Sequence, residues 1–238
     1  MEILKVISHL MAYPTAELVA HRGELAAVVG SAPEIPADIR DGLLDLLNRL
    51  AGRELMDVQE EYCAQFDRGR SLSLLLFEHV HGESRDRGQA MVDLMDVYHR
   101  NGFEISVREL PDYIPLYLEF LAQRPEEEAR EGLADVGHIL GMLSARLQER
   151  ESPYHILFDA LLYLSGEEVN IVEMRKTAAA EERDDTMEAF DKVWEEEAVS
   201  FAAKSATTSG GAGCRPQTMP GVAREDQAVP VHWVNQQK

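Results

Sequence analysis

The sequence predicts an all-α fold, a single-domain helical bundle followed by a mobile C-terminal tail, and three observations support that prediction. Through most of residues 1–166, apolar side chains recur at spacings of three and four, which places them on one face of a helix. No segment alternates polar and apolar residues as a half-buried strand does. From residue 167 the chain is acidic and then low in complexity, so we expect residues 167–238 to be largely disordered.

The first part of the chain predicts four amphipathic helices. Their apolar faces lie within residues 3–11, 18–28, 39–50 and 55–66. Thr15 has a side chain suited to accept a hydrogen bond at the start of the second helix, and Gly52 follows the end of the third.

Residues 71–95 carry the most distinctive pattern, because a charged corner separates two predicted helices. An apolar run over residues 72–77 leads into a polar patch over residues 78–87. Gly82 can end the first helix, and Asp86, with Gln89 three residues later, fits the start of the second. The first helix would be apolar around most of its circumference, so it is either the central core helix or one wall of a groove.

Three further helices are predicted before residue 167. Asp112 can cap a helix through Tyr117 and Leu121, in which Pro115 occupies the first turn. A long regular stripe extends over residues 133–147, and a last helix begins at residues 152–153 and ends at Gly166.

The charge and the cysteine content limit the possible functions. The chain has 238 residues and a formal net charge of -20, so its field repels nucleic acid and anionic membrane surfaces and favours a basic partner. Its two cysteines are too few and too far apart for a disulfide framework, which indicates a reducing compartment. The N-terminus lacks the pattern of a signal peptide, and no later stretch is long and apolar enough to span a bilayer. We therefore expect a cytoplasmic protein that does not insert into a membrane.

Six ionisable side chains crowd the corner between the two central helices: Glu78, His79, His81, Glu83, Arg85 and Arg87. They lack the spacing of a zinc site, because histidines two residues apart point to different sides of a helix. The arginines are expected to pair with the nearby carboxylates. The sequence has no motif of a hydrolase or a phosphate-binding loop, so we expect no metal, no cofactor and no enzymatic activity.

Four segments of the sequence together resemble one family. They are residues 74–91, which read LLLFEHVHGESRDRGQAM, and residues 62–67, 109–113 and 118–121. The pattern closely resembles the NarJ-type assembly chaperones of membrane-bound respiratory nitrate reductase, over roughly the first two-thirds of the chain. That family belongs with the TorD and DmsD type of redox-enzyme maturation chaperones, whose fold is all-helical. Sister branches carry a Pro-x-Asp-His hinge where this chain has Leu-Pro-Asp-Tyr, so their nucleotide binding is not transferred.

The resemblance implies a partner and a task. The partner would be the cofactor-free catalytic (alpha) subunit of nitrate reductase, bound partly through its N-terminal segment, a basic and apolar remnant of a twin-arginine-type signal. The chaperone would hold that subunit open until the molybdenum cofactor and an iron–sulfur cluster are inserted. It would also delay membrane docking and would be absent from the finished enzyme. Proteins of molybdenum cofactor biosynthesis are further expected partners.

The expected peptide site combines a groove wall with an acidic rim. The wall residues are Tyr62, Phe66, Leu75, Phe77, Met91, Leu94, Tyr117 and Leu118. The rim residues, which would meet the basic residues of the peptide, are Glu78, Glu83, Asp86 and Glu119. The other corner residues, His79, His81, Arg85 and Arg87, would order the corner, although packing within the chain explains them equally well.

Two other classes of function remain open at this point. As a metal-dependent hydrolase, the chain would bind its metal at the corner that holds Glu78 and His81, and purified protein would contain stoichiometric metal. As a permanent structural subunit of the reductase, the chain would co-purify with the fully loaded, active enzyme.

Overall fold

Helices α1 to α5 follow the amphipathic pattern of the first part of the chain. The computed structural model describes residues 1–82, 85–105, 109–167, 169–189 and 191. The first helices are α1 (Glu2–Met11), α2 (Ala16–Ala20), α3 (Arg22–Ser31), α4 (Ala37–Ala51) and α5 (Leu55–Phe66). The Thr15 side chain accepts a hydrogen bond from the Leu18 N–H and so caps α2, as predicted. The helix predicted around residues 18–28 is divided, because α2 and α3 meet at His21.

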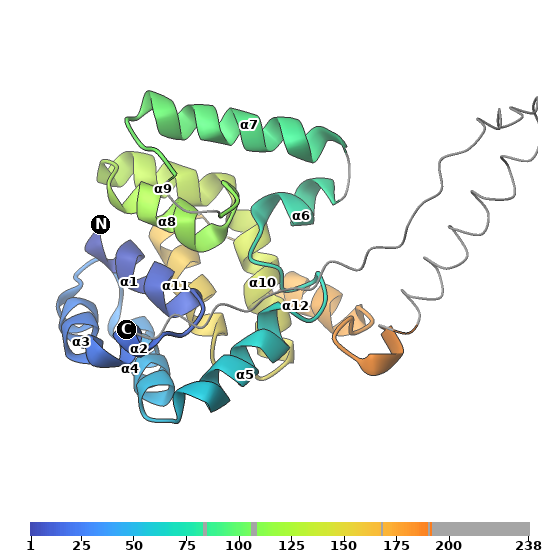
Figure 1. Cartoon of the computed structure of the whole chain (residues 1–238), viewed down its shortest axis with the longest axis horizontal. Coiled ribbons are helices and arrows are strands. Elements are labelled where there is room, and N and C mark those ends of the chain that lie inside the picture. The colour runs from blue at the N-terminus through green and yellow to red at the C-terminus, as the bar shows by residue number, and fades with distance from the viewer. Residues whose placement is uncertain (83–84, 106–108, 168, 190, 192–238) are drawn as a thin grey trace, which may run out of the picture. The chain divides into compact units, whose positions relative to one another are not determined.

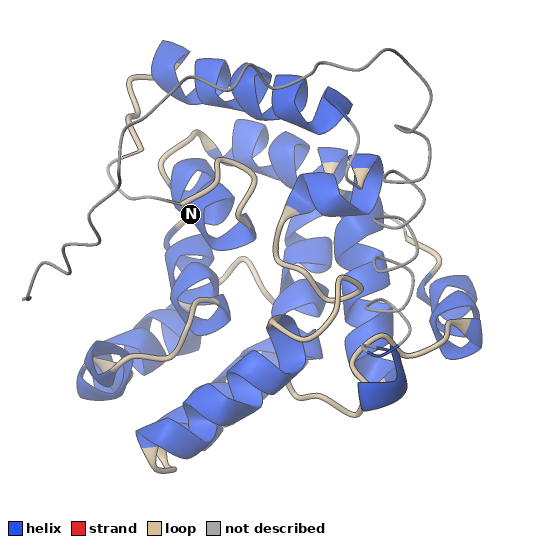
Figure 2. Cartoon of the chain, turned by 45° about the vertical axis from the view of Figure 1, so that its right-hand side comes forward, coloured by secondary structure: helices blue, strands red, loops and turns tan. Residues whose placement is uncertain are grey.

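The later helices complete an all-α fold. They are α6 (Leu76–His81), α7 (Arg85–Arg100), α8 (Ile114–Ala122), α9 (Glu126–Asp135), α10 (Gly137–Glu149), α11 (His155–Ser165) and α12 (Ile171–Ala180). Figures 1 and 2 show their arrangement, and the described residues contain no β-strand. Gly82 and Gly166 end α6 and α11 with φ angles of 54° and 74°, in agreement with their predicted roles. The prediction of an all-α fold is confirmed.

Helix α11 lies at the centre of the hydrophobic core. It packs against α1, α4, α9 and α10. Leu157, Phe158 and Leu161 are fully buried in α11, whereas Leu76 is the only residue of α6 that is buried. The apolar run before the charged corner therefore does not form the central core helix.

Helix α8 packs along α1 and closes one side of the core. The Ser8 hydroxyl of α1 donates a hydrogen bond to the Pro115 carbonyl oxygen, 2.8 Å away. Pro115 occupies the first turn of α8, as predicted. Leu118 is only 1% exposed and belongs to the core, so it does not line a groove as the sequence predicted. The apolar periodicity of α8 did not distinguish a covered face from an open one.

The segment before α6 is extended, which corrects the predicted helix over the apolar run. Leu75 has φ -103° and ψ 111° and forms a single antiparallel bridge with Tyr113. The Ile114 N–H donates to the Leu74 carbonyl oxygen, and the Leu76 N–H donates to the Asp112 carbonyl oxygen. A continuous apolar run is compatible with either conformation. Here the hydrogen bonds to residues 112–114 select the extended one.

Helix α7 is amphipathic but only partly covered. It lies over α8 and α9 in Figure 1, and among the described helices its closest packing partner is α6. Tyr98 is its one buried residue, and the Tyr98 hydroxyl donates to the Pro111 carbonyl oxygen at 2.8 Å. The helix begins one residue before Asp86, and the Gln89 side chain bonds to Asp93 instead. The predicted start of this helix, with Asp86 as its cap, is therefore corrected.

The bundle continues past residue 166, which corrects the predicted start of the disordered tail. Helix α12 packs against α10, where a Cβ atom on Gly141 would lie 2.6 Å from Met174 Sδ. Arg146 of α10 makes two hydrogen bonds with the Glu181 carboxylate, at 2.7 and 2.8 Å. Because α12 has no buried residue, its apolar content did not predict that it packs against α10. Residues 192–238, the rest of the predicted tail, lie outside the described residues.

A second contact ties the segment after α12 to the loop after α5. The Ser71 N–H and hydroxyl donate to the two Asp184 carboxylate oxygens, at 2.7 and 2.6 Å. Arg150 donates to the same carboxylate at 3.0 Å. Gly69 has φ 88°, and a Cβ atom there would lie 2.5 Å from Asp184 Cγ, so only glycine allows this approach.

Across the described ranges, no helix has both the length and the hydropathy to cross a bilayer.

Candidate functional site

An open pocket with aromatic walls lies between α5, the end of α1 and the chain segments before α6 and α8. Its volume is ≈ 440 Å³, and we call it the aromatic pocket. Three of the predicted wall residues, Tyr62, Phe66 and Leu75, lie here together. The full lining is Tyr13, Tyr62, Phe66, Asp67, Ser73, Leu74, Leu75, Glu109, Leu110 and Tyr113.

The walls of the aromatic pocket are held in place by ring packing and by one buried hydrogen bond. The Tyr62 ring centroid lies 5.5 Å from that of Tyr13, edge-on, and 4.9 Å from that of Phe66. The Tyr62 hydroxyl donates to the Met11 carbonyl oxygen at 3.0 Å. Burial raises the pKa of Tyr62 and of Tyr113, so both phenols are uncharged at neutral pH. The pocket therefore offers a firm, uncharged apolar surface.

The charged residues that line the aromatic pocket are both acidic. Asp67 and Glu109 are exposed at its edge, and no lysine or arginine is among its lining residues. Tyr13 and Leu110 are also open to solvent, with exposed fractions of 46% and 41%. An occupant with both apolar and basic side chains fits this combination.

The charged corner is built around a buried carboxylate that sequence reasoning assigned elsewhere. Asp112 is fully buried and accepts a hydrogen bond from the Phe77 N–H at 3.1 Å. It therefore caps α6, whereas α8, its predicted partner, starts without a side-chain cap. Arg87 of α7 donates to Glu78 at 2.9 Å, and its other terminal nitrogen is 3.9 Å from Asp112. These contacts join the starts of α6 and α7 to the turn before α8.

Glu78 has its cationic partner within the chain. Burial alone would raise the pKa of Glu78, but hydrogen bonds from Ser73 and Arg87 outweigh burial and lower it. The carboxylate is thus ionised and paired, so Glu78 is not a free rim residue as the sequence predicted. His79 Nε2 lies 2.8 Å from the Ser73 carbonyl oxygen. Burial lowers the pKa of His79, so the neutral ring donates this hydrogen bond.

The other predicted site residues are dispersed. The rings of Phe77 and His81 lie 6.0 Å apart at the corner, and the Tyr117 hydroxyl donates to the Gly132 carbonyl oxygen of α9. The remaining described residues are exposed (Arg85, Asp86 and Glu119) or half-buried on α7 (Met91 and Leu94). Glu83 lies outside the described residues. The predicted site is therefore divided among the aromatic pocket, the corner and the core.

Sequence reasoning missed seven lining residues of the aromatic pocket: Tyr13, Asp67, Ser73, Leu74, Glu109, Leu110 and Tyr113. Five of them, all except Tyr13 and Ser73, belong to the segments that carry the family resemblance, which was a usable signal. Tyr13 had none, because it lies about fifty residues from its ring partner Tyr62 and in no motif.

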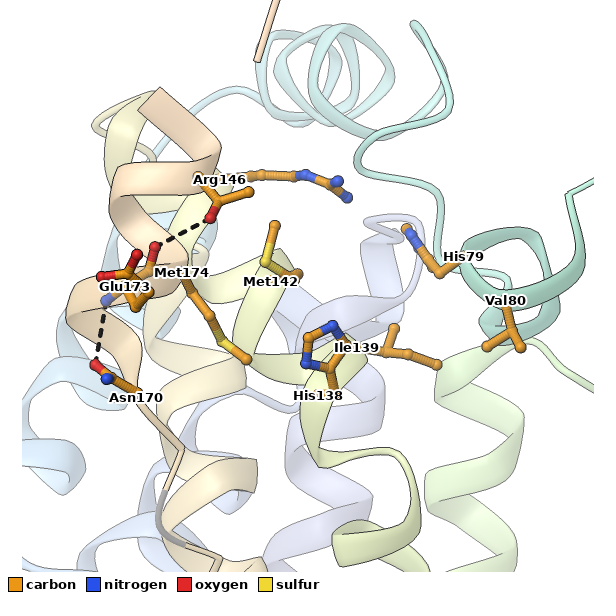
Figure 3. Close-up of a pocket in the computed structure, with 10 residues that line it drawn as sticks. His79, Val80, His138, Ile139, Met142, Arg146, Asn170, Glu173 and Met174 are labelled. Carbon is orange, nitrogen blue, oxygen red and sulfur yellow. Dashed lines mark hydrogen bonds between the residues drawn. The ribbon is translucent and has the colours of Figure 1, made fainter. Parts of the chain in front are cut away.

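Another pocket, of ≈ 510 Å³, lies between α6, α10 and α12. Figure 3 shows His79 and Val80 of α6 opposite His138 and Met142 of α10, with Met174 of α12 beside them. Arg146, at one edge, is already paired with the Glu181 carboxylate, so it is not free to bind a ligand anion. Among the described residues, no group of three or more histidine, cysteine or acidic side chains could hold a metal ion.

Comparisons with known proteins agree with one another. The family described as nitrate reductase delta subunit matches residues 32–160. The chain is 50% identical over 200 residues to the nitrate reductase molybdenum cofactor assembly chaperone NarJ of Escherichia coli K12, covering 84% of this chain and 85% of that protein. It is 50% identical over 208 residues to the probable chaperone NarW of the same strain, covering 87% of each.

A more distant relative shows the same relationship. The probable nitrate reductase molybdenum cofactor assembly chaperone NarJ of Bacillus subtilis is 31% identical over 156 residues, covering 66% of this chain and 84% of that protein. All lining residues of the aromatic pocket except Tyr13 fall within the residues that match the family.

Proposed function

The chain belongs to the nitrate reductase delta subunit family, and from that membership we propose that it is an assembly chaperone for the catalytic subunit of a nitrate reductase. It binds the cofactor-free subunit in the cytoplasm, partly through the N-terminal segment of that subunit. It holds the subunit open for insertion of the molybdenum cofactor and an iron–sulfur cluster, and it delays docking to the membrane. It acts by binding, without a chemical step, and it leaves before the enzyme is complete.

The observation that carries this proposal is the identity to named assembly chaperones along most of the chain. The relative is 50% identical over 84% of the chain. The match also covers 85% of the relative, so it is not confined to one shared segment. The family match over residues 32–160 includes the charged corner and all lining residues of the aromatic pocket except Tyr13.

The geometry of the aromatic pocket supports a peptide-binding role. Apolar side chains of the N-terminal segment pack against the exposed Tyr13 and Leu110 and the half-buried Leu75, where burial of apolar area favours binding. Tyr62 and Phe66, only 4% and 6% exposed, contribute little further area. Basic side chains of the same segment meet Asp67 and Glu109 at the edge. An occupant bound in this way would leave the ion pair between Glu78 and Arg87 intact.

Chaperone action requires that the protein distinguish the unfinished subunit from the finished one. A binding protein shifts a conformational equilibrium only by its differential affinity for the two forms. Each tenfold preference for the cofactor-free form corresponds to about 1.4 kcal/mol. Proteins that deliver the molybdenum cofactor can act on the complex while the subunit is held open.

A calorimetric titration tests the proposed peptide site. The full chain is titrated with a synthetic peptide that copies the N-terminal segment of the nitrate reductase catalytic subunit from the same organism. We expect saturable one-to-one binding. Leu110→Arg places a cation at the open edge of the aromatic pocket, and it should weaken binding at least tenfold, or by about 1.4 kcal/mol.

Val172→Arg is the matched control. Val172 is 68% exposed on α12, away from the lining residues of the aromatic pocket, so the same added charge should change the affinity less than twofold. Wild-type protein that does not bind the peptide would contradict the proposal. If Leu110→Arg and Val172→Arg protein bind the peptide with equal affinity, the aromatic pocket is not part of the peptide site.

A further inference from the structure

A groove outside the predicted site lies between α1 and the pair formed by α2 and α3. Its volume is ≈ 540 Å³, which is within the range of ligand-binding pockets. The floor is apolar, with Val6 and Leu18 only 3% and 8% exposed. Leu25 and Val28 of α3 complete the floor and are half-buried.

The incomplete burial of α3 explains why this groove is apolar. In a helix of ten residues, α3 buries only Val29, whereas α1 buries seven of its ten. Leu25 and Val28 touch the core but keep part of their surface open to the groove. An open apolar strip of this kind is available to pack against the apolar face of another segment.

The rim of the groove is acidic. Glu2, Glu17 and Glu24 line it, and Lys5 is the only lysine or arginine among the lining residues. Three carboxylates against one ammonium leave an excess of two negative charges when the histidines are neutral. His21 lies 3.3 Å from Glu24 on the same rim, so the carboxylates of Glu2 and Glu17 are the more available of the three. This charge favours a basic segment.

Tyr13 connects the groove to the aromatic pocket, because it lines both. Ala12 is extended after the end of α1, and Pro14 follows Tyr13, with its carbonyl oxygen held by the Gln59 side chain at 2.8 Å. The Tyr13 ring stands edge-on to Tyr62 and is 46% exposed. The two cavities therefore adjoin on either side of one aromatic side chain.

We propose that the groove and the aromatic pocket bind a single continuous segment of the catalytic subunit, an inference that rests on the proposed function. The apolar part of the N-terminal segment occupies the aromatic pocket. Its basic, amphipathic part crosses Tyr13 and lies in the groove, with apolar side chains on Leu25 and Val28 and basic side chains toward Glu2 and Glu17. An arginine at the crossing point can stack on the exposed Tyr13 ring.

Charge reversal in the groove tests this inference. Full-length Glu2→Lys/Glu17→Lys protein is titrated with the same synthetic peptide, beside Glu127→Lys/Glu131→Lys protein, which has the same charge change at exposed positions of α9. We expect the groove variant to bind at least tenfold more weakly at low salt and the α9 variant to change less than twofold. The difference should shrink at about 0.5 M salt, where exposed charges are screened.

A neutralising variant and a second peptide complete the test. Glu2→Gln/Glu17→Gln protein avoids placing lysines near the starts of α1 and α2, and it should still bind at least threefold more weakly. A peptide whose lysines and arginines are replaced by glutamine should bind wild-type protein and both groove variants equally. If the groove variants match the α9 variant while Leu110→Arg still blocks binding, the inference is wrong and the proposed function stands. If wild-type protein binds no peptide, both are wrong.

Discussion

The carboxylate of Asp112 accepts a hydrogen bond from the backbone N–H of Phe77, at 3.1 Å, across 35 positions of the sequence. The first turn of a helix leaves N–H groups without partners, and a buried one is costly. The Asp112 side chain, in the turn before α8, is the acceptor for one of these N–H groups of α6. Because α6 carries Glu78 and His79, this contact positions the part of the charged corner that lies on α6.

Loss of the Asp112 carboxylate should therefore destabilise the fold. In Asp112→Ala protein, α6 loses its cap and the half-buried Arg87 loses a neighbouring charge, which together should cost about 2 kcal/mol. Urea unfolding measures this free energy. Asp86→Ala, at an exposed carboxylate of α7, is the control and should cost less than about 0.5 kcal/mol. Equal losses would show that the cap contributes little.

Replacing either of two helical glycines by alanine should change the stability of the protein, but in opposite directions. A Cβ atom on Gly42 would lie 2.7 Å from Ile156 Cγ1, so Gly42→Ala should destabilise the protein by about 1 kcal/mol or more despite its better helix propensity. Gly88 in α7 has no atom within 4 Å of such a Cβ, so Gly88→Ala should stabilise by about 0.5–1 kcal/mol. Thermal or urea unfolding of both variants measures the difference. If both substitutions changed the free energy of unfolding in the same direction, the result would contradict the packing of α4 against α11.

His79 should make stability fall as the pH falls below 6.5. Burial, assisted by the charge of Arg146, lowers the pKa of His79 from 6.5 in the folded chain. Below pH 6.5 the unfolded chain takes up a proton that the folded chain resists, so the free energy of unfolding decreases until the folded-state pKa is reached. His79→Gln protein keeps a side-chain N–H and does not titrate.

Urea unfolding of wild-type and His79→Gln protein between about pH 7.5 and 5.5 tests this prediction. The wild type should lose more stability than the variant as the pH falls. His138→Gln, at an exposed histidine of α10, should follow the wild-type profile. Parallel curves for wild type and His79→Gln would contradict a neutral, half-buried His79.

The Asp184 contacts should hold α12 on the bundle. Burial alone would raise the pKa of Asp184, but hydrogen bonds from Ser71 and Arg150 lower it, so the carboxylate is ionised at pH 7. Asp184→Ala should speed hydrogen exchange of the α12 amides about tenfold, with α11 unchanged. Glu188→Ala, at an exposed position nearby, should leave both unchanged. Slow exchange of α12 in the Asp184 variant would mean that the other contacts suffice.

The sequence was a good guide to several local interactions. Thr15 caps α2 through an N–H three residues away, and Gly82 and Gly166 end their helices through their own φ angles. Asp86 with Gln89 was a local prediction that failed, and two other failures involve partners that lie far apart in the sequence. Asp112 was assigned to the next helix, but its hydrogen-bond donor is Phe77. The partner of Glu181 is Arg146, so composition alone indicated only an acidic tail.

The candidate site shows the same limit. Tyr62, Phe66 and Leu75 were placed together because all lie in segments of the family pattern, and the structure brings them to one pocket. Leu118 has the same apolar character but is covered by the core. Helical periodicity identifies an apolar face without showing what covers it. The groove between α1 and α3 was missed for the complementary reason. Leu25 and Val28 belong to the predicted apolar face of residues 18–28, and only the fold shows that this face stays partly open.

Binding to two forms of the catalytic subunit distinguishes an assembly chaperone from a permanent subunit. Tagged full-length protein is mixed with the nitrate reductase catalytic subunit, either free of cofactor or fully loaded, and the bound fraction is quantified at equal concentrations. We expect strong retention of the cofactor-free subunit and at least tenfold weaker retention of the loaded one. Equal retention of both forms, or stable incorporation of the chain into the active enzyme, would contradict the proposed chaperone function.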